Sequence, residues 1–366
     1  MSSINLPVRL LDLSPTELTD FVEALGVPKS AVGLLGRYLY REAACSFEEM
    51  TELPPALRSK LSEQTVLGAL EPIDEIISAD GQTRKVLFRL EDGKTIESTL
   101  MFFRNPGTGR ARRTVCVSTQ VGCALGCPYC ATGRQGFERN LSPGEIVGQV
   151  IYFAQRFGAD DPERETGKSR NWVTHVVFMG MGEPLTNYDN VVKAVAILNW
   201  QQGMGLGFHQ VTVSTAGLAP QIIRLAGEGL QFQLAVSLHA ATDKLRDRLV
   251  PVNRKYPLSV LIPACREYAA TTGRKVFIEY ALFDGVNDSL DQVDELLHLL
   301  EGLDCSINLI VGNPTCAESF QPSSRETALA FQKRLITGGI RTMLRVSRGA
   351  DIEAGCGQLR SRWLNA

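Results

Sequence analysis

The sequence predicts an α/β protein in which a partial (βα)6-type barrel follows a small N-terminal helical accessory domain. Two patterns support this fold class. From residue 113 onward, short β-rich runs alternate with amphipathic helical stretches, which is typical of parallel strands joined by helices. Before residue 71, apolar residues instead recur at helical spacing. The 366 residues, of which 44% are hydrophobic, suffice for one large core and a smaller module.

Residues 1–71 form the expected accessory domain. Its first helix begins with Ser14 as the N-cap, Pro15 at the first helical position and Glu17 completing a capping box. Gly26 marks the end of that helix. Further short helices are expected at residues 34–39, 46–50 and 57–61.

Residues 72–112 are expected to form a β-hairpin region between the helical domain and the barrel. The runs Lys85–Leu90 and Thr95–Phe102 alternate polar and apolar residues, and Glu91-Asp92-Gly93 between them is a hairpin signal. The segment Phe103–Arg113, which follows the second run, is basic.

The barrel is expected to span residues 113–350, with a C-terminal loop at 351–366. Its strands are predicted at residues 114–118, 172–179, 210–214, 232–238, 276–282, 306–311 and 342–346. Clear amphipathic helices lie at 143–157 and 290–300, while the charged stretch 160–171 is predicted to be an exposed insertion. Because the chemistry of such barrels collects where strands end and loops begin, functional residues are expected directly after the strands.

Composition limits the function classes. There is no run of about 18 uncharged apolar residues and no signal-peptide pattern at the N-terminus, so we expect no membrane contact and a cytoplasmic location. The net charge of −2 indicates no nucleic-acid partner by itself. Two local clusters of arginine fit either phosphate contacts or a solvated surface. They comprise Arg104, Arg110, Arg112 and Arg113, and then Arg341, Arg345, Arg348, Arg360 and Arg362.

Three cysteines follow the first barrel strand in the loop Cys123-Ala-Leu-Gly-Cys127-Pro-Tyr-Cys130. Their thiolates can converge on one inorganic centre, and three ligands on a four-iron, four-sulfur (4Fe-4S) cluster leave one iron open for a small molecule. Structural zinc is the main alternative, but it usually takes four protein ligands, and no neighbouring Cys or His supplies the fourth. Three buried cysteines without a ligand are the remaining alternative.

The turn after the second strand reads Met179-Gly180-Met181-Gly182-Glu183-Pro184. Gly182 lets the backbone approach a ligand, and the Glu183 carboxylate can accept a hydrogen bond from an ammonium group. Taken alone, such a turn is more often an ordinary loop, and its place downstream of the cysteine triad favours a cofactor-binding role.

Small polar residues follow the later strands. Ser214 ends the third strand, and Ser237, Leu238 and His239 end the fourth. Asn313 follows the strand at 306–311 and can bond a ribose or an adenine, although it also fits a turn before a proline. We expect these residues at the same mouth of the barrel, whereas a lone histidine is more often structural.

Two further cysteines have distinctive settings. Cys116 lies in a β-rich run seven residues before Cys123. Cys356 lies between two glycines, which leaves its thiol unshielded in a mobile loop, as a reactive nucleophile requires. Four other cysteines are predicted to be packing residues, namely Cys45, Cys265, Cys305 and Cys316.

Taken together, these motifs resemble the RlmN family of radical S-adenosylmethionine (SAM) RNA methyltransferases over nearly the whole chain. The resemblance rests on the segments 46–54, 116–123, 136–141, 180–184, 237–239 and 348–359. Relative to that family, the segment Phe103–Arg113 is longer and more basic. The resemblance implies a radical SAM barrel, a cluster held by Cys123, Cys127 and Cys130, and SAM bound at the strand ends.

The resemblance also implies a reaction and its partners. One SAM methylates Cys356, and a second SAM is cleaved to a radical that activates this methyl group for transfer to C2 of an adenine in 23S rRNA and tRNA. Cys116 then forms a transient disulfide with Cys356, and Glu97 matches a residue assigned as proton acceptor. From the residues alone, Glu97 fits an exposed strand carboxylate. A cytosolic one-electron donor and a monomeric enzyme complete the expectation.

Two alternatives remain open. One is C8 methylation of the same adenine, as in the related Cfr enzymes. The other is a non-catalytic, metal-stabilised RNA-binding protein, which the presence of both Cys116 and Cys356 argues against because a binder has no use for a redox pair.

Overall fold

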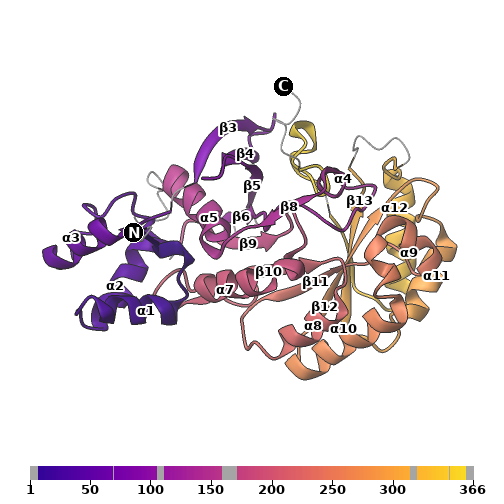
Figure 1. Ribbon diagram of the computed structural model, residues 1–366. Coiled ribbons are helices and arrows are strands. Elements are labelled where there is room, and N and C mark those ends of the chain that lie inside the picture. The colour runs from indigo at the N-terminus through magenta and orange to yellow at the C-terminus, as the bar shows by residue number, and fades with distance from the viewer. Residues whose placement is uncertain are drawn as a thin grey trace.

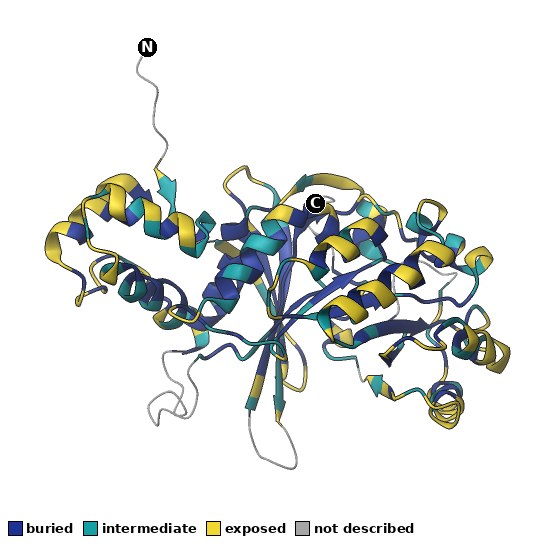
Figure 2. Cartoon of the chain, turned by 90° about the horizontal axis from the view of Figure 1, so that it is seen from below, coloured by how far each residue is buried: buried dark blue, intermediate teal, exposed yellow. Residues whose placement is uncertain are grey.

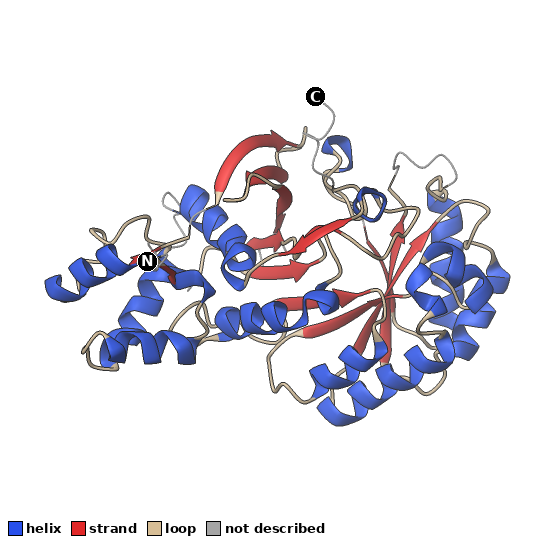
Figure 3. Cartoon of the chain, in the orientation of Figure 1, coloured by secondary structure: helices blue, strands red, loops and turns tan. Residues whose placement is uncertain are grey.

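A ten-stranded mixed sheet runs through the molecule, as the computed structural model shows for residues 7–68, 70–104, 111–158, 171–313, 320–345 and 347–359. The strand order is β14-β13-β12-β11-β10-β9-β6-β5-β4-β3 (Figures 1 and 3). Its parallel strands are β6 (Ala111–Cys116), β9 (His175–Phe178), β10 (Val211–Thr215), β11 (Gln233–Ser237), β12 (Val276–Leu282), β13 (Cys305–Val311) and β14 (Thr342–Arg345). Within the described residues β14 pairs with β13 alone, so the predicted partial barrel is confirmed.

The predicted hairpin extends this sheet on one edge. Strands β4 (Thr83–Arg89) and β5 (Thr95–Arg104) pair in antiparallel fashion, and β5 pairs with β6. An additional strand, β3 (Glu71–Ile77), completes the edge. It escaped prediction because its residues lie exposed or half-buried and its apolar and charged residues lack a clean alternation. A separate two-stranded ribbon, β7 (Gln120–Gly122) with β8 (Phe137–Asn140), lies beside the cysteine loop.

Helices cover the outer face of the parallel strands (Figure 3). They are α5 (Pro143–Gly158), α7 (Tyr188–Asn199), α8 (Ala219–Ala226), α9 (Asp243–Leu249), α10 (Leu258–Thr272), α11 (Leu290–Leu299) and α12 (Arg325–Thr337). Shorter helical turns are α4 (Ala131–Gln135), η3 (Pro184–Asn187), η4 (Pro251–Arg254) and η5 (Ala350–Ile352). Figure 2 shows that these helices bury one face against the sheet and leave the other in solvent. The charged stretch 160–170 lies outside the described residues.

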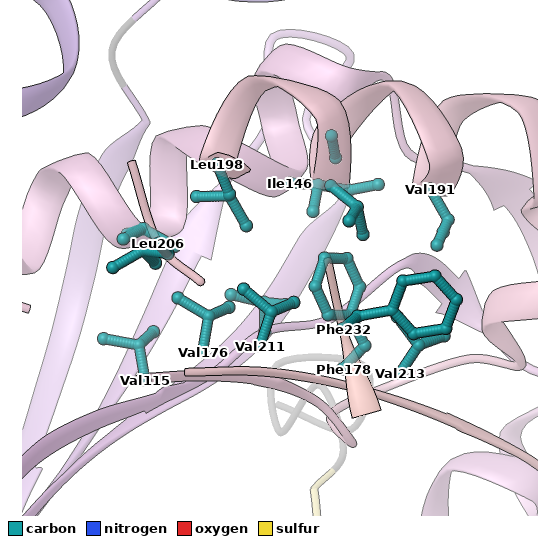
Figure 4. Close-up of a cluster of buried hydrophobic side chains, with 14 of the residues drawn as sticks. Val115, Ile146, Val176, Phe178, Val191, Leu198, Leu206, Val211, Val213 and Phe232 are labelled. Carbon is teal, nitrogen blue, oxygen red and sulfur yellow. The ribbon is translucent and has the colours of Figure 1, made fainter. Parts of the chain in front are cut away.

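The core forms where α5 and α7 meet the sheet (Figure 4). Ile146 of α5 and Leu198 of α7 point toward Val176 and Val211 of the strands, and all four are completely buried. Burial of each such side chain contributes about 1.5–3 kcal/mol. This packing holds the strand ends, and the loops that follow them, in fixed positions.

The N-terminal part is mainly helical, as predicted. It contains α1 (Pro15–Ala24), α2 (Ser30–Gly36), the π-helix η2 (Arg37–Glu42) and α3 (Pro55–Gln64), with the short elements β1 (Val8–Arg9), η1 (Leu10–Asp12) and β2 (Thr65–Val66). The capping box is present, since the Ser14 and Glu17 side chains each accept the other's backbone N–H. The helix expected at 46–50 is wrong. The Glu49 carboxylate accepts the Cys45 N–H at 3.0 Å and closes a turn there instead.

The accessory helices dock onto the barrel through a close contact around Trp200. The Tyr40 and Trp200 rings meet edge to face, with 6.1 Å between centroids. A Cβ atom on Gly36 of α2 would lie 2.1 Å from the Trp200 ring. The Arg41 guanidinium also donates to the Gly203 carbonyl at 2.8 Å. None of the described helices combines the length and apolar character needed to cross a lipid bilayer.

Because the Trp200 ring leaves no room for a methyl group on Gly36, Gly36→Ala should weaken the contact between the accessory domain and the barrel. We expect the free energy of unfolding to fall by about 1–3 kcal/mol, the usual cost of overpacking. Urea unfolding and limited proteolysis of α1–α3 would measure it. Gly227→Ala is the matched control, since its Cβ would meet only the Arg224 carbonyl at 3.6 Å. Equal stability of the two variants would contradict the tight contact.

Candidate active site

The cysteine loop lies at the carboxyl edge of the parallel strands. The Cys123 N–H donates to the Gly136 carbonyl at 2.7 Å, and the Cys130 N–H donates to the Cys127 carbonyl at 3.1 Å. Gly122 precedes the loop with a φ of 73°, and a Cβ there would lie 1.8 Å from the Gly136 oxygen, so only glycine fits. All three thiols line one cavity of about 170 Å³, as the spacing predicted.

The donor set of this cavity fits an iron–sulfur cluster. Burial raises the pKa of the Cys123 thiol to about 12 and raises the pKa values of Cys127 and Cys130 as well. A cationic metal core would hold the same sulfurs as thiolates, the preferred ligands of iron–sulfur clusters. Among the described residues, no three His, Cys, Asp or Glu side chains are grouped so as to hold a single metal ion.

The predicted turn at Gly182 and Glu183 forms another wall of this cavity. Gly182 has a φ of 101°, and a Cβ there would lie 2.6 Å from the Gln120 Cβ. The Glu183 carboxylate accepts the Ala216 N–H at 2.7 Å and the Leu185 N–H at 3.0 Å. Burial raises the pKa of this carboxyl. Glu183 therefore ties the loop after β9 to the end of β10.

Most of the other strand-end residues meet at the same cavity. Ser214, Ser237, His239 and Asn313 line it, whereas the Leu238 side chain is completely buried in the core. The His239 Nδ1 accepts the Ala281 N–H at 3.0 Å, which leaves the proton of the neutral ring on Nε2. Burial and the Arg246 charge lower the His239 pKa to about 3, so the imidazole is neutral.

Arg246 is a residue to which the sequence analysis assigned no role. Its guanidinium is completely buried and donates to the carbonyls of Ala216 at 2.6 Å and Leu238 at 3.1 Å, and to the Asn253 side chain at 2.8 Å. Burial lowers its pKa to about 10, which still leaves it charged at neutral pH. A charged stretch such as Asp243–Arg248 normally indicates a solvated helix, so the sequence carried no signal of this burial.

A second cavity, of about 430 Å³, lies on the other side of Cys356. Cys116 lines the second cavity, and Cys356 lines both cavities, so the structure brings the two predicted reactive cysteines together. Glu279 also lines both cavities, and its carboxylate accepts a 2.7 Å hydrogen bond from the Asn308 amide. The sequence analysis missed Glu279 because it lies within the strand β12 rather than after it.

Hydrogen bonds seat the C-terminal loop between the two cavities. The Asn313 side-chain amide donates to the Cys356 carbonyl at 3.1 Å, and the Ala131 N–H donates to the Gly357 carbonyl at 2.7 Å. Cys356 is solvent-accessible through the cavities, while the protein around it desolvates the thiol and raises its pKa. The loop therefore presents an accessible thiol at a defined position.

Glu97 is buried, in contrast to the exposed strand carboxylate that its residues alone suggested. It is 2% exposed, and its Oε1 lies 3.4 Å from the Lys85 Nζ. The same ammonium group donates to the Glu353 carbonyl at 3.2 Å, so Lys85 links Glu97 to the loop of Cys356. Glu97 also shares a sheet face with Thr99, which pairs with Cys116.

The remaining cysteines and arginines separate into distinct groups. Cys265 and Cys305 are buried as predicted, but Cys45 is exposed, and Cys316 lies outside the described residues. Arg113 is buried and donates to the Trp172 carbonyl at 2.5 Å. Exposed arginines are Arg104, Arg112, Arg341 and Arg345, while Arg110, Arg360 and Arg362 lie outside the described residues.

Because the Glu183 carboxylate accepts two buried N–H groups, Glu183→Ala should leave both unpaired. Each buried unpaired group costs about 1–3 kcal/mol, and we expect a corresponding drop in the free energy of unfolding in urea. Glu183→Gln, which retains one acceptor oxygen, should lose less. An unchanged unfolding midpoint in Glu183→Ala would contradict this role.

Comparisons with known proteins agree with the site. Residues 117–300 match the radical SAM superfamily, and residues 8–67 match the ribosomal RNA large subunit methyltransferase N-terminal domain. The first match covers half of the chain and includes the cysteine triad, and the second covers the accessory helices.

Similar full-length proteins are also known. The chain is 43% identical to a probable dual-specificity RNA methyltransferase RlmN from Moorella thermoacetica, covering 96% of this chain and 97% of that protein. A Thermotoga neapolitana protein of the same name is 43% identical with the same coverage. A crystal structure of a radical SAM methyltransferase from Sphaerobacter thermophilus superposes with a TM-score of 0.87 at 47% identity, covering 97% of this chain and 99% of that chain.

Proposed function

The chain belongs to the RlmN family of radical SAM proteins, and on this basis we propose that it methylates C2 of adenine in 23S rRNA and tRNA. One observation supports this most directly. Cys356 lies between a cavity that carries the three cluster cysteines and a second cavity that carries Cys116. A methyl carrier that must collect its group on one side and deliver it on the other requires such a position.

Cys123, Cys127 and Cys130 would hold the cluster, and SAM would bind along the strand ends. When bound, the cluster supplies the electron that cleaves SAM and so starts radical chemistry. The chain's own residues hold the cofactor in place. Gly182 and Glu183 shape one wall of its site, and the wall residues Ser214, Ser237, His239 and Asn313 offer polar groups, with Leu238 supporting them from the core.

Cys356 serves as the methyl carrier in this proposal. Its thiolate attacks the methyl carbon of a first SAM and releases S-adenosylhomocysteine, and a second SAM is then consumed for each methyl group transferred. The carrier is needed because the adenine C2 carbon, flanked by two ring nitrogens, is not nucleophilic enough to take a methyl group from SAM by direct attack. Attack of the Cys116 thiolate on the Cys356 sulfur would break the bond between that sulfur and the transferred carbon, which keeps the electron pair and takes up a proton to become the methyl group. The two cysteines, which line one cavity, are left as a disulfide.

Glu97 accepts the C2 proton in this proposal. It shares a sheet face with the residue that pairs with Cys116, and its buried ion pair with Lys85 favours the carboxylate that a proton acceptor must be. Lys85 acts through Glu97 and is a positioning residue. We further propose that the enzyme is a cytoplasmic monomer that receives electrons from a one-electron donor protein.

The product of the reaction tests the proposal. Protein reconstituted anaerobically with iron and sulfide should convert adenosine in protein-free 23S rRNA to 2-methyladenosine, as measured by mass spectrometry of digested nucleosides. Cys356→Ala should abolish the product because the methyl carrier is lost. Cys45→Ala, at an exposed cysteine outside both cavities, should retain it.

Two results would change this assignment. Formation of 8-methyladenosine would assign the chain to C8 methylation while leaving the role of Cys356 intact. If SAM stays intact in the presence of a cluster, a reductant and several RNAs, a catalytic function is excluded. The result would favour a metal-stabilised RNA-binding protein.

Loss of the proton acceptor should stall the reaction after carbon–carbon bond formation. In Glu97→Gln we therefore expect a covalent protein–RNA adduct on denaturing gels and a fall in 2-methyladenosine of roughly 10²–10⁴-fold, the usual range for removal of a general base. Glu71→Gln is the matched control on β3 of the same sheet, since its side chain is 60% exposed. Normal turnover in Glu97→Gln would assign the proton transfer to another group.

A further inference from the structure

Arginines from both sequence clusters line the larger cavity, namely Arg112, Arg345 and Arg348. Strand pairing places Arg112 of β6 opposite Phe103 of β5, and Arg345 ends β14 on the far side. The guanidinium carbons of Arg348 and Arg112 lie 4.5 Å and 5.7 Å from the Phe103 ring centroid. Residues that are more than 200 positions apart in sequence therefore surround one aromatic ring.

Positive charge in this cavity exceeds negative charge. Three arginines line the cavity, while Glu279 is the one carboxylate among the described lining residues. The Arg112 Nε donates to the uncharged Thr114 hydroxyl at 3.1 Å. In the described part of the chain neither Arg112 nor Arg345 forms an ion pair within 4.0 Å. Desolvation by the surrounding protein lowers the Arg112 pKa, and the positive charge of the Arg345 guanidinium lowers it further.

Arg348 differs from the other two arginines. Its guanidinium is half-buried, lies over the Phe103 ring and is 4.0 Å from the Asp80 carboxylate. It therefore has partners within the protein and braces Phe103, while the exposed Arg112 and Arg345 remain available to a ligand. Like charges held close together, with Glu279 as the one carboxylate among the described lining residues, form an anion site.

The interior of the cavity indicates what kind of anion enters. Besides the arginines its walls carry methionines and Ile310, and Cys116 and Cys356 also line it. A ligand that reaches the thiols thus combines an apolar, planar part with negative charge beside the arginines. A nucleotide whose base is turned out of its stack has this form, and bases become accessible in single-stranded loops of RNA.

We propose that Arg112 and Arg345 form a phosphodiester clamp that grips the backbone of single-stranded RNA beside the adenosine that enters the larger cavity, with Phe103 and Arg348 as its brace. This inference rests on the proposed function and assigns a phosphate site to Arg112 of β6 and Arg345 of β14.

Salt dependence of RNA binding tests the clamp. The probe is a fluorescent RNA hairpin with an unpaired adenosine in its loop, and its Kd for the cluster-loaded full chain is measured by anisotropy over a series of KCl concentrations. Each phosphate contact contributes about 0.7 to the slope of log Kd against log salt for single strands. Arg112→Gln and Arg345→Gln should each weaken binding and lower the slope by about that amount.

Two sets of variants separate charge from folding. Arg112→Lys and Arg345→Lys retain the charge and should keep the slope while binding somewhat more weakly, because lysine lacks the planar fork. Arg266→Gln removes an arginine of α10 outside the cavity and should leave Kd and slope at the wild-type values. Melting temperature and iron content confirm that each variant is folded and loaded.

The outcomes distinguish the clamp from the proposed function. If the wild type binds and methylates the hairpin but both glutamine variants retain its Kd and slope, the clamp is wrong and the methyltransferase remains. If the wild type neither binds nor methylates any RNA tried, the proposed function and the clamp both fail. A slope lowered only in the Arg112 and Arg345 variants supports the clamp.

Discussion

Backbone groups at the carboxyl ends of the parallel strands are buried, and the whole site depends on how they are paired. A buried N–H or C=O without a partner is costly, so each strand end needs a hydrogen-bond partner. Two charged side chains provide several of these partners. Glu183 accepts N–H groups from the loops after β9 and β10, and Arg246 donates to carbonyls after β10 and β11. Opposite charges thus bind neighbouring loops into one rigid rim.

The rim supports a loop that comes from the other end of the chain. Ala131 and Asn313 hold the backbone around Cys356, and Lys85 holds the Glu353 carbonyl from the hairpin side. A Cβ on Gly355 would lie 2.6 Å from the Asn313 amide nitrogen. The glycine next to Cys356 therefore permits close packing against Asn313, in contrast to the mobile loop that the sequence suggested. Defined placement suits a thiol that must reach two cavities.

The sequence predicted those features that follow from local pattern. The triad at Cys123, the capping box and the alternation of strands and helices each depend on residues close together in the chain, and the structure agrees with them. Features that depend on tertiary context were missed. Arg246 looks like a surface residue until the strand carbonyls surround it, and Glu279 lies inside an otherwise apolar strand.

Which segments of the chain build the walls of the larger cavity has an evolutionary consequence. Cys123, Cys127 and Cys130 lie within residues 117–300, the part that matches the radical SAM superfamily. Most of the larger cavity is instead built by segments outside that part, before residue 117 and after residue 300. Such flanking segments can diverge without disturbing the shared centre. New targets can thus arise through replacement of the peripheral walls, while the machinery that generates reactivity is inherited intact.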